Sequence, residues 1–200
     1  MQLSTRKIIM IASWALALLA VLALLWVRVI EPRITRDVAG ELGHGDYTLV
    51  AADGTTFTED SLKGAPTAIF FGFTHCPEVC PTTLGDIATW QEELIGAGEE
   101  PLRTAFITVD PERDTPELID EYVSWAPGLT GFSGSREEVD KAIRSFRIYA
   151  SQVPLENGDY TMSHSTSILL FDSNGDYYGV IGYQEEYERV MDKIHSLRAS

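Results

Sequence analysis

The chain of 200 residues contains only two cysteines, Cys76 and Cys80, within the segment Gly-Phe-Thr-His-Cys-Pro-Glu-Val-Cys-Pro at residues 72–81. A continuous apolar run precedes this segment and a helical pattern follows it, so we predict a strand that turns directly into a helix. The free N–H groups at the start of a helix stabilise anions and therefore favour thiolates. The four-residue spacing predicts that both sulfurs lie on one helical face.

The spacing of the pair argues for metal binding over a purely structural disulfide. A thioredoxin-type redox pair is Cys-x-x-Cys, whereas this chain has Cys-x-x-x-Cys. A disulfide remains geometrically feasible, since one helical turn separates Cα atoms by about 6 Å, but so short a loop removes little chain entropy. We predict that Cys76 and Cys80 are metal ligands, and that they form the catalytic pair if the site is redox active.

Two thiolates seldom hold a metal ion alone, and His164 is the best third ligand. It stands directly before a predicted strand at 166–171, so its side chain is expected to open onto the crevice beside the cysteine turn. The ordinary alternative is a solvated loop histidine. The remaining histidines lie in a linker, beside the first cysteine or on a polar helix face: His44, His75 and His195.

Two sulfurs and one imidazole favour copper. Zinc would be one ligand short of a closed structural site. Soft thiolates with one nitrogen suit Cu(I), and the same set accommodates Cu(II) with a further weak ligand, so both oxidation states stay open.

The elements that must position these residues are strands and helices in alternation. Apolar runs and turn signals predict the following strands: 47–51, 55–58, 67–73, 102–109, 166–171 and 177–181. Apolar periodicity and capping signals predict helices that span or begin at these places: 84–95, 114–123, 135–146 and 187–197. Residues 150–163 are predicted to be an irregular loop. This order predicts an α/β fold, a thioredoxin-like mixed sheet flanked by helices, with the site at the carboxyl ends of the central strands.

The amino-terminal segment predicts one transmembrane helix. Residues 8–27 form an uncharged stretch of 20 residues, which spans roughly 30 Å as a helix. Charged residues follow it in place of the small residues of a cleavage site, so we expect an uncleaved anchor, with a cleaved signal peptide as the alternative. The predicted organisation is an anchor at 1–30, a tether at 31–45 and a thioredoxin-like copper-binding domain at 46–200.

The expected compartment of the protein and the net charge of its soluble part limit the kinds of partner that it can bind. Basic residues flank both sides of the apolar stretch, so they leave the orientation open, but the cysteine pair favours an oxidising compartment. We expect a single-pass protein of a bacterial inner membrane whose soluble domain faces the periplasm or cell exterior. Beyond residue 36 there are 29 acidic and 10 basic residues, a net charge of −19. This field excludes nucleic acid and favours a cationic ligand or basic partner, unless it serves solubility alone.

Taken together, these features resemble the Sco/SenC family of copper-binding assembly factors for cytochrome c oxidase. The resemblance rests on four segments and covers roughly residues 45–195, besides the single amino-terminal anchor. The segments are 72–81, 108–115 (Thr-Val-Asp-Pro-Glu-Arg-Asp-Thr), 131–139 and 160–164. One departure is Ser163, where the family commonly has an aspartate before the histidine.

The resemblance implies that Cys76, Cys80 and His164 hold copper. It implies a chaperone for the dinuclear copper (CuA) centre of cytochrome c oxidase subunit II, with other copper chaperones or thiol reductants as further partners. The alternative is a thiol–disulfide oxidoreductase that reduces the cysteines of that centre; a peroxidase and a redox sensor are weaker alternatives. Asp110 is expected either to orient a ligand or contact a partner, or simply to end a strand in a turn ahead of Pro111, and Asp114 is expected to cap a helix.

Overall fold

The computed structural model describes residues 5–30, 40–156 and 158–200, which form two compact units divided between Glu41 and Leu42. Most of the predicted tether, 31–39, lies outside the described residues. The last tether residues belong to the second unit: Leu42 packs against its core, and the Gly43 N–H donates to the Ser145 carbonyl at 2.9 Å.

The first unit is helical. Helix α1 (Thr5–Leu25) continues into a π-helical turn, η1 (Trp26–Ile30). Ile9–Arg28 is 20 residues long and reaches a mean hydropathy of 2.5 over 18 residues, so it is long and apolar enough to cross a membrane. Length and composition support the predicted span, although a signal sequence shares both properties.

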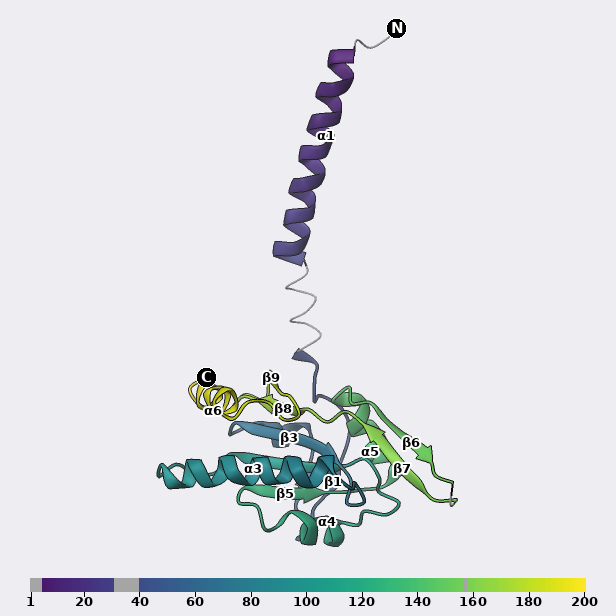
Figure 1. The fold of residues 1–200 in the computed structure, drawn as a ribbon, viewed down its shortest axis with the longest axis vertical. Coiled ribbons are helices and arrows are strands. Elements are labelled where there is room, and N and C mark those ends of the chain that lie inside the picture. The colour runs from purple at the N-terminus through teal and green to yellow at the C-terminus, as the bar shows by residue number, and fades with distance from the viewer. Residues whose placement is uncertain (1–4, 31–39, 157) are drawn as a thin grey trace. The chain divides into compact units, whose positions relative to one another are not determined.

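The second unit is built on a five-stranded mixed sheet with the order β5-β4-β3-β8-β9 (Figure 1). Its strands are β3 (Thr67–Gly72), β4 (Arg103–Thr108), β5 (Leu129–Phe132), β8 (Ile168–Phe171) and β9 (Tyr177–Ile181). The first three are parallel, while β8 and β9 are antiparallel to their neighbours. Every residue of β3 is buried, as its continuous apolar run predicts for a central strand covered on both faces.

Helices cover both faces of the sheet, as predicted. Helices α3 (Val79–Gly96), α4 (Pro116–Val123) and α6 (Tyr187–Arg198) lie on one face. The other face carries α5 (Arg136–Ser145), the 3-10 turn η2 (Glu59–Leu62) and a hairpin of β1 (Leu49–Val50) and β2 (Thr56–Phe57).

Two elements differ from the sequence-based expectation. Residues 150–163 are not an irregular loop, because β6 (Ala150–Pro154) and β7 (Tyr160–His164) pair as an antiparallel hairpin. Only Met162 of these strands is buried, so the stretch lacks the apolar alternation that signals a strand. Strand β5 was missed because it is short and contains Gly131. Glycine is needed at this position, since an added Cβ would clash with the Ile119 side chain.

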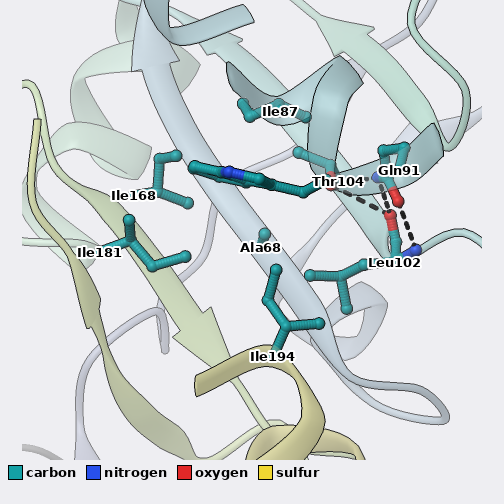
Figure 2. A pocket seen from close by; sticks show the side chains of 9 residues that line it. Ala68, Ile87, Gln91, Leu102, Thr104, Ile168, Ile181 and Ile194 are labelled. Atoms are coloured by element: carbon teal, nitrogen blue, oxygen red, sulfur yellow. Dashed lines mark hydrogen bonds between the residues drawn. The ribbon is translucent and has the colours of Figure 1, made fainter. Parts of the chain in front are cut away.

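A buried glutamine joins α3 to the start of β4 beside a small apolar cavity of about 10 Å³ (Figure 2). The Gln91 side chain donates to the Leu102 carbonyl at 2.6 Å and accepts from the Leu102 N–H at 2.7 Å. It therefore bonds to both backbone groups of the residue that precedes β4.

We expect Gln91→Leu to lower the free energy of unfolding by about 1–3 kcal/mol, because the buried Leu102 N–H loses its partner, whereas the Leu102 carbonyl keeps the Thr104 hydroxyl, which donates to it at 3.1 Å. Urea denaturation followed by circular dichroism measures the change. Glu92→Leu, at the exposed next position of α3, is the matched control and should change stability little. Equal stabilities of the two variants would contradict the role assigned to Gln91.

Candidate metal centre

The cysteine turn connects β3 to α3 but places the two cysteines differently from the prediction. Helix α3 begins at Val79, so Cys80 lies in its first turn whereas Cys76 lies in the preceding loop. The expectation that both side chains share one helical face is therefore wrong. The Cys80 N–H instead donates to the Cys76 sulfur at 3.3 Å, and this sulfur satisfies a free donor at the helix start.

His164 reaches the cysteines because of the sheet topology. Strand β8 runs antiparallel to β3 and pairs Ile168 with Phe70, so the chain that enters β8 lies at the carboxyl end of β3. The His164 Nε2 atom is 3.8 Å from the Cys80 sulfur. The ligand atoms of Cys76, Cys80 and His164 all lie within 4.8 Å of one another, so the predicted juxtaposition is present.

The imidazole is held in the orientation that a metal ligand requires. Its Nδ1 atom lies 2.7 Å from the Ser165 carbonyl oxygen. Because a carbonyl can only accept, Nδ1 carries a proton, and Nε2 is the ring nitrogen that faces the Cys80 sulfur and could bind a metal ion. The ring also makes an edge-to-face contact with Phe73, with centroids 5.7 Å apart. The Ser165 carbonyl thus orients the ring in this chain. Ser163, at the position where the family commonly has an aspartate, is exposed.

The two sulfurs have opposite acid–base character. The pKa of Cys76 is lowered to about 4, chiefly because the Cys80 thiol donates a hydrogen bond to it. The pKa of Cys80 is raised, because its proton is held in that bond and its side chain is fully buried. The metal-free pair is therefore one half-buried thiolate beside one buried thiol.

We expect iodoacetamide to alkylate Cys76 much faster than Cys80 in the reduced, metal-free protein. Because the Cys76 pKa is lowered, the alkylation rate of Cys76 should rise between about pH 3 and 5 and then level off. The rate of an ordinary thiol, by contrast, still rises near pH 8.5. Peptide mapping by mass spectrometry across pH 3–9 measures both rates. A Cys76 rate that still climbs above pH 8 would contradict the assignment.

Two residues that support the cysteine turn were not recognised as such in the sequence. An added Cβ at Gly72 would lie 2.7 Å from the Phe106 ring and 3.0 Å from the Cys80 sulfur, so only glycine allows this approach. Asp114 is fully buried, although it was expected to cap a helix. The residue that caps α4 is Thr115, whose hydroxyl accepts from the Leu118 N–H.

Asp114 instead fixes the loop that leads into Cys76. Its carboxylate accepts hydrogen bonds from the Thr74 N–H at 3.1 Å, the Thr74 hydroxyl at 2.5 Å and the Thr108 hydroxyl at 2.6 Å. These bonds join the turn after β3 to the end of β4. The sequence signal available was Thr108, a polar residue at the carboxyl end of β4 that bonds to this carboxylate.

The other candidates lie outside the three-ligand group. Among the described residues, the remaining histidines and Asp110 do not join it. His75 is half-exposed and lies 3.1 Å from the Thr74 hydroxyl, and His44 lies 3.7 Å from Glu59. His195 is exposed on α6, and Asp110 is buried at the end of β4.

The fold and the site define a thioredoxin-like domain with a Cys-Cys-His group, suited to a soft metal ion, at the carboxyl end of its central strand. The SCO1/SenC family pattern matches residues 37–199. The chain therefore belongs to the SCO1/SenC family.

Individual relatives agree with this membership. The mitochondrial SCO1 homolog of Homo sapiens is 36% identical over 168 residues, which cover 82% of this chain and 56% of that protein. The SCO2-like protein of Rickettsia felis is 32% identical over 188 residues, covering 88% of this chain and 89% of its own length. This chain matches about half the length of several mitochondrial relatives, for example 51% of Saccharomyces cerevisiae SCO2.

Solved structures show the same fold, and some of them contain copper. Bradyrhizobium japonicum ScoI with copper bound is 38% identical, with a TM-score of 0.67 over 78% of this chain and 99% of that one. Yeast Sco1 with copper bound is 33% identical, with a TM-score of 0.72 over 80% of this chain and 90% of that one. The thioredoxin-like fold is thus confirmed.

Proposed function

We propose that this chain is a membrane-anchored copper chaperone that assists assembly of the CuA centre of cytochrome c oxidase subunit II. The observation that carries the proposal is the convergence of the Cys76, Cys80 and His164 ligand atoms within 4.8 Å. Family membership and the copper-bound structures of relatives support it. The acidic soluble domain adds a surface suited to a basic partner.

The donor set fits copper as cargo. Two thiolates and one neutral imidazole are soft ligands, and their small number leaves room for an incoming ligand from the acceptor protein. Cys80 is fully buried whereas Cys76 and His164 are partly exposed, so exchange begins at the exposed pair and Cys80 releases the ion last. The ion passes from one set of ligands to the next without becoming free.

A second function, reduction of the partner's cysteines, is favoured by the lowered Cys76 pKa. The Cys76 thiolate would attack the partner disulfide and form a mixed disulfide, while one partner sulfur leaves as a thiolate. Cys80 would then displace the second partner sulfur. The partner is thereby reduced to a dithiol and the Cys76–Cys80 pair is oxidised to a disulfide, which an external dithiol must reduce before the next cycle.

Copper transfer under anaerobic conditions tests the chaperone function. The reduced protein is loaded with Cu(I) or Cu(II) and mixed with the metal-free soluble domain of subunit II, with its cysteines either reduced or oxidised. We expect one copper ion per chain and, where Cu(I)-loaded and Cu(II)-loaded protein are supplied together, the absorption of the mixed-valence CuA centre in the reduced acceptor. The double variant Cys76→Ser/Cys80→Ser is the control. Equal copper binding by wild type and this variant would overturn the proposal, and reduction of the oxidised acceptor without metal would assign reductase activity.

We also propose that the helix at Ile9–Arg28 anchors the chain in a bacterial inner membrane, with the second unit in the periplasm or outside the cell. The length and hydropathy of this helix support the proposal, as does the copper-bound bacterial relative. Carbonate extraction of membranes tests the anchor, and protease access in spheroplasts tests the orientation. Release of a shortened chain into the soluble fraction would indicate a cleaved signal sequence instead.

A further inference from the structure

Strand β7 turns three side chains toward the body of the domain. Residues two apart in a strand point to the same side, so Tyr160, Met162 and His164 face the body of the domain together. Met162 is buried in the core, and His164 lies against Cys80 at the carboxyl end of the strand. Tyr160, at the other end, is about 13 Å from His164 along the strand.

Tyr160 is held by a buried aspartate and an arginine from the segment after β4. One Asp110 carboxylate oxygen accepts from the Tyr160 hydroxyl at 2.7 Å, and the other accepts from Arg113 Nε at 2.5 Å. Arg113 also donates to the Tyr160 carbonyl at 3.0 Å, and its guanidinium carbon lies 3.9 Å from the Tyr160 ring centroid. We call Asp110, Arg113 and Tyr160 the clasp.

The hairpin needs such an attachment. Within the described part of the chain, β6 and β7 form a separate two-stranded sheet and pair only with each other. An isolated two-stranded hairpin is marginally stable in water, so its contacts with the body decide where it lies. Figure 1 shows the hairpin projecting beside the central sheet.

We propose that the clasp positions His164 for metal binding, and that Asp110 is a positioning residue that acts through Tyr160. A slip of β7 by one residue would turn its whole inward face outward and remove His164 from the sulfurs. The clasp prevents this at one end of the strand, because Asp110 is fully buried and offers the Tyr160 hydroxyl a fixed acceptor. The inference rests on the proposed copper site and names a further part of it.

Tyr160→Phe tests the inference because it removes only the hydroxyl and keeps the ring beneath Arg113. We expect Cu(I) affinity to fall by about 10-fold or more, in the range found when an outer partner of a metal ligand is removed. In the metal-free protein, we expect the amides of β6 and β7 to exchange with deuterium faster than in wild type. Chelator competition and mass spectrometry measure the two effects.

Tyr47→Phe is the matched control. The Tyr47 hydroxyl is buried and donates to the Gly43 carbonyl at 2.8 Å, on the face of the sheet that α5 covers. This variant loses the same kind of bond, so it should lower the melting temperature but leave copper affinity and β6–β7 exchange unchanged. Arg113→Lys is a second variant that keeps the charge but cannot bridge Asp110 and the Tyr160 carbonyl in the same way.

The outcomes separate the inference from the proposed function. Faster hairpin exchange with unchanged copper affinity in Tyr160→Phe and Arg113→Lys would overturn the positioning role, as would wild-type behaviour in both measurements. Equal losses of copper affinity in Tyr160→Phe and Tyr47→Phe would also overturn it. If wild type bound copper no better than Cys76→Ser/Cys80→Ser, the proposed function would fail, while the exchange measurement would still show whether the clasp holds the hairpin.

Discussion

Replacement of His164 by alanine is expected to lower copper affinity by more than about 100-fold. Removing an outer partner of a metal ligand already costs about 10–100-fold, and this change removes a ligand itself. The effect on folding should be small, because His164 is partly exposed and its ring contact is with the edge of Phe73. Competition with a chelator measures the affinity, and the thiolate-to-copper absorption band reports the loss of the imidazole.

The matched control is His195→Ala, which removes an exposed imidazole from α6 and should bind copper as wild type does. Intact stoichiometry, affinity and absorption in His164→Ala would show that the ring is not a ligand. A loss of affinity in both variants would instead point to a general effect of histidine removal and not to this site.

The ligand residues could be predicted because each lies next to a strong local signal. The unbroken apolar run of β3 identified a central strand, and Cys76, in the loop that follows this strand, is thereby placed at the working edge of the sheet. His164 was found in the same way, from its place just ahead of the apolar strand β8. The topology that brings the two strand ends together follows from the mixed sheet.

The residues that hold the ligands in place could not be predicted, because their role depends on contacts between segments that are distant in the sequence. Asp110 and Asp114 have the sequence signature of turn and cap residues, and their burial appears only once Tyr160 and Thr74 are in place. The hairpin of β6 and β7 gave no strand signal, since its position depends on these tertiary contacts more than on apolar alternation.

The segment 110–114 therefore supports both halves of the site. Asp114 fixes the loop before Cys76, and Asp110 holds the strand that ends in His164. Cys80 and His164 are 84 residues apart in the sequence, so local structure alone cannot set the distance between them. One short segment after β4 sets that distance, because it bonds both to the loop before Cys76 and to strand β7.

Asp114→Ala is accordingly expected to lower the free energy of unfolding by about 3–5 kcal/mol. Three donors lose their acceptor at about 1–3 kcal/mol each: the buried Thr108 hydroxyl and the partly buried N–H and hydroxyl of Thr74. Because natural domains are stable by only about 5–15 kcal/mol, this is a large share of the total. Urea denaturation of the reduced, metal-free protein measures it, and faster alkylation of Cys80 would report the loosened loop.

Asp140→Ala is the control at the surface, because the Asp140 side chain is partly exposed and forms an ion pair with Arg136 at 3.1 Å. Exposed pairs contribute about 0–1 kcal/mol, so this variant should unfold near the wild-type midpoint. Asp114→Asn keeps one acceptor oxygen and should fall between the two. If Asp114→Ala were as stable as Asp140→Ala, the carboxylate would not be what holds the cysteine turn to β4, and the loop would have to be fixed by the packing of Gly72 against Phe106 and Cys80.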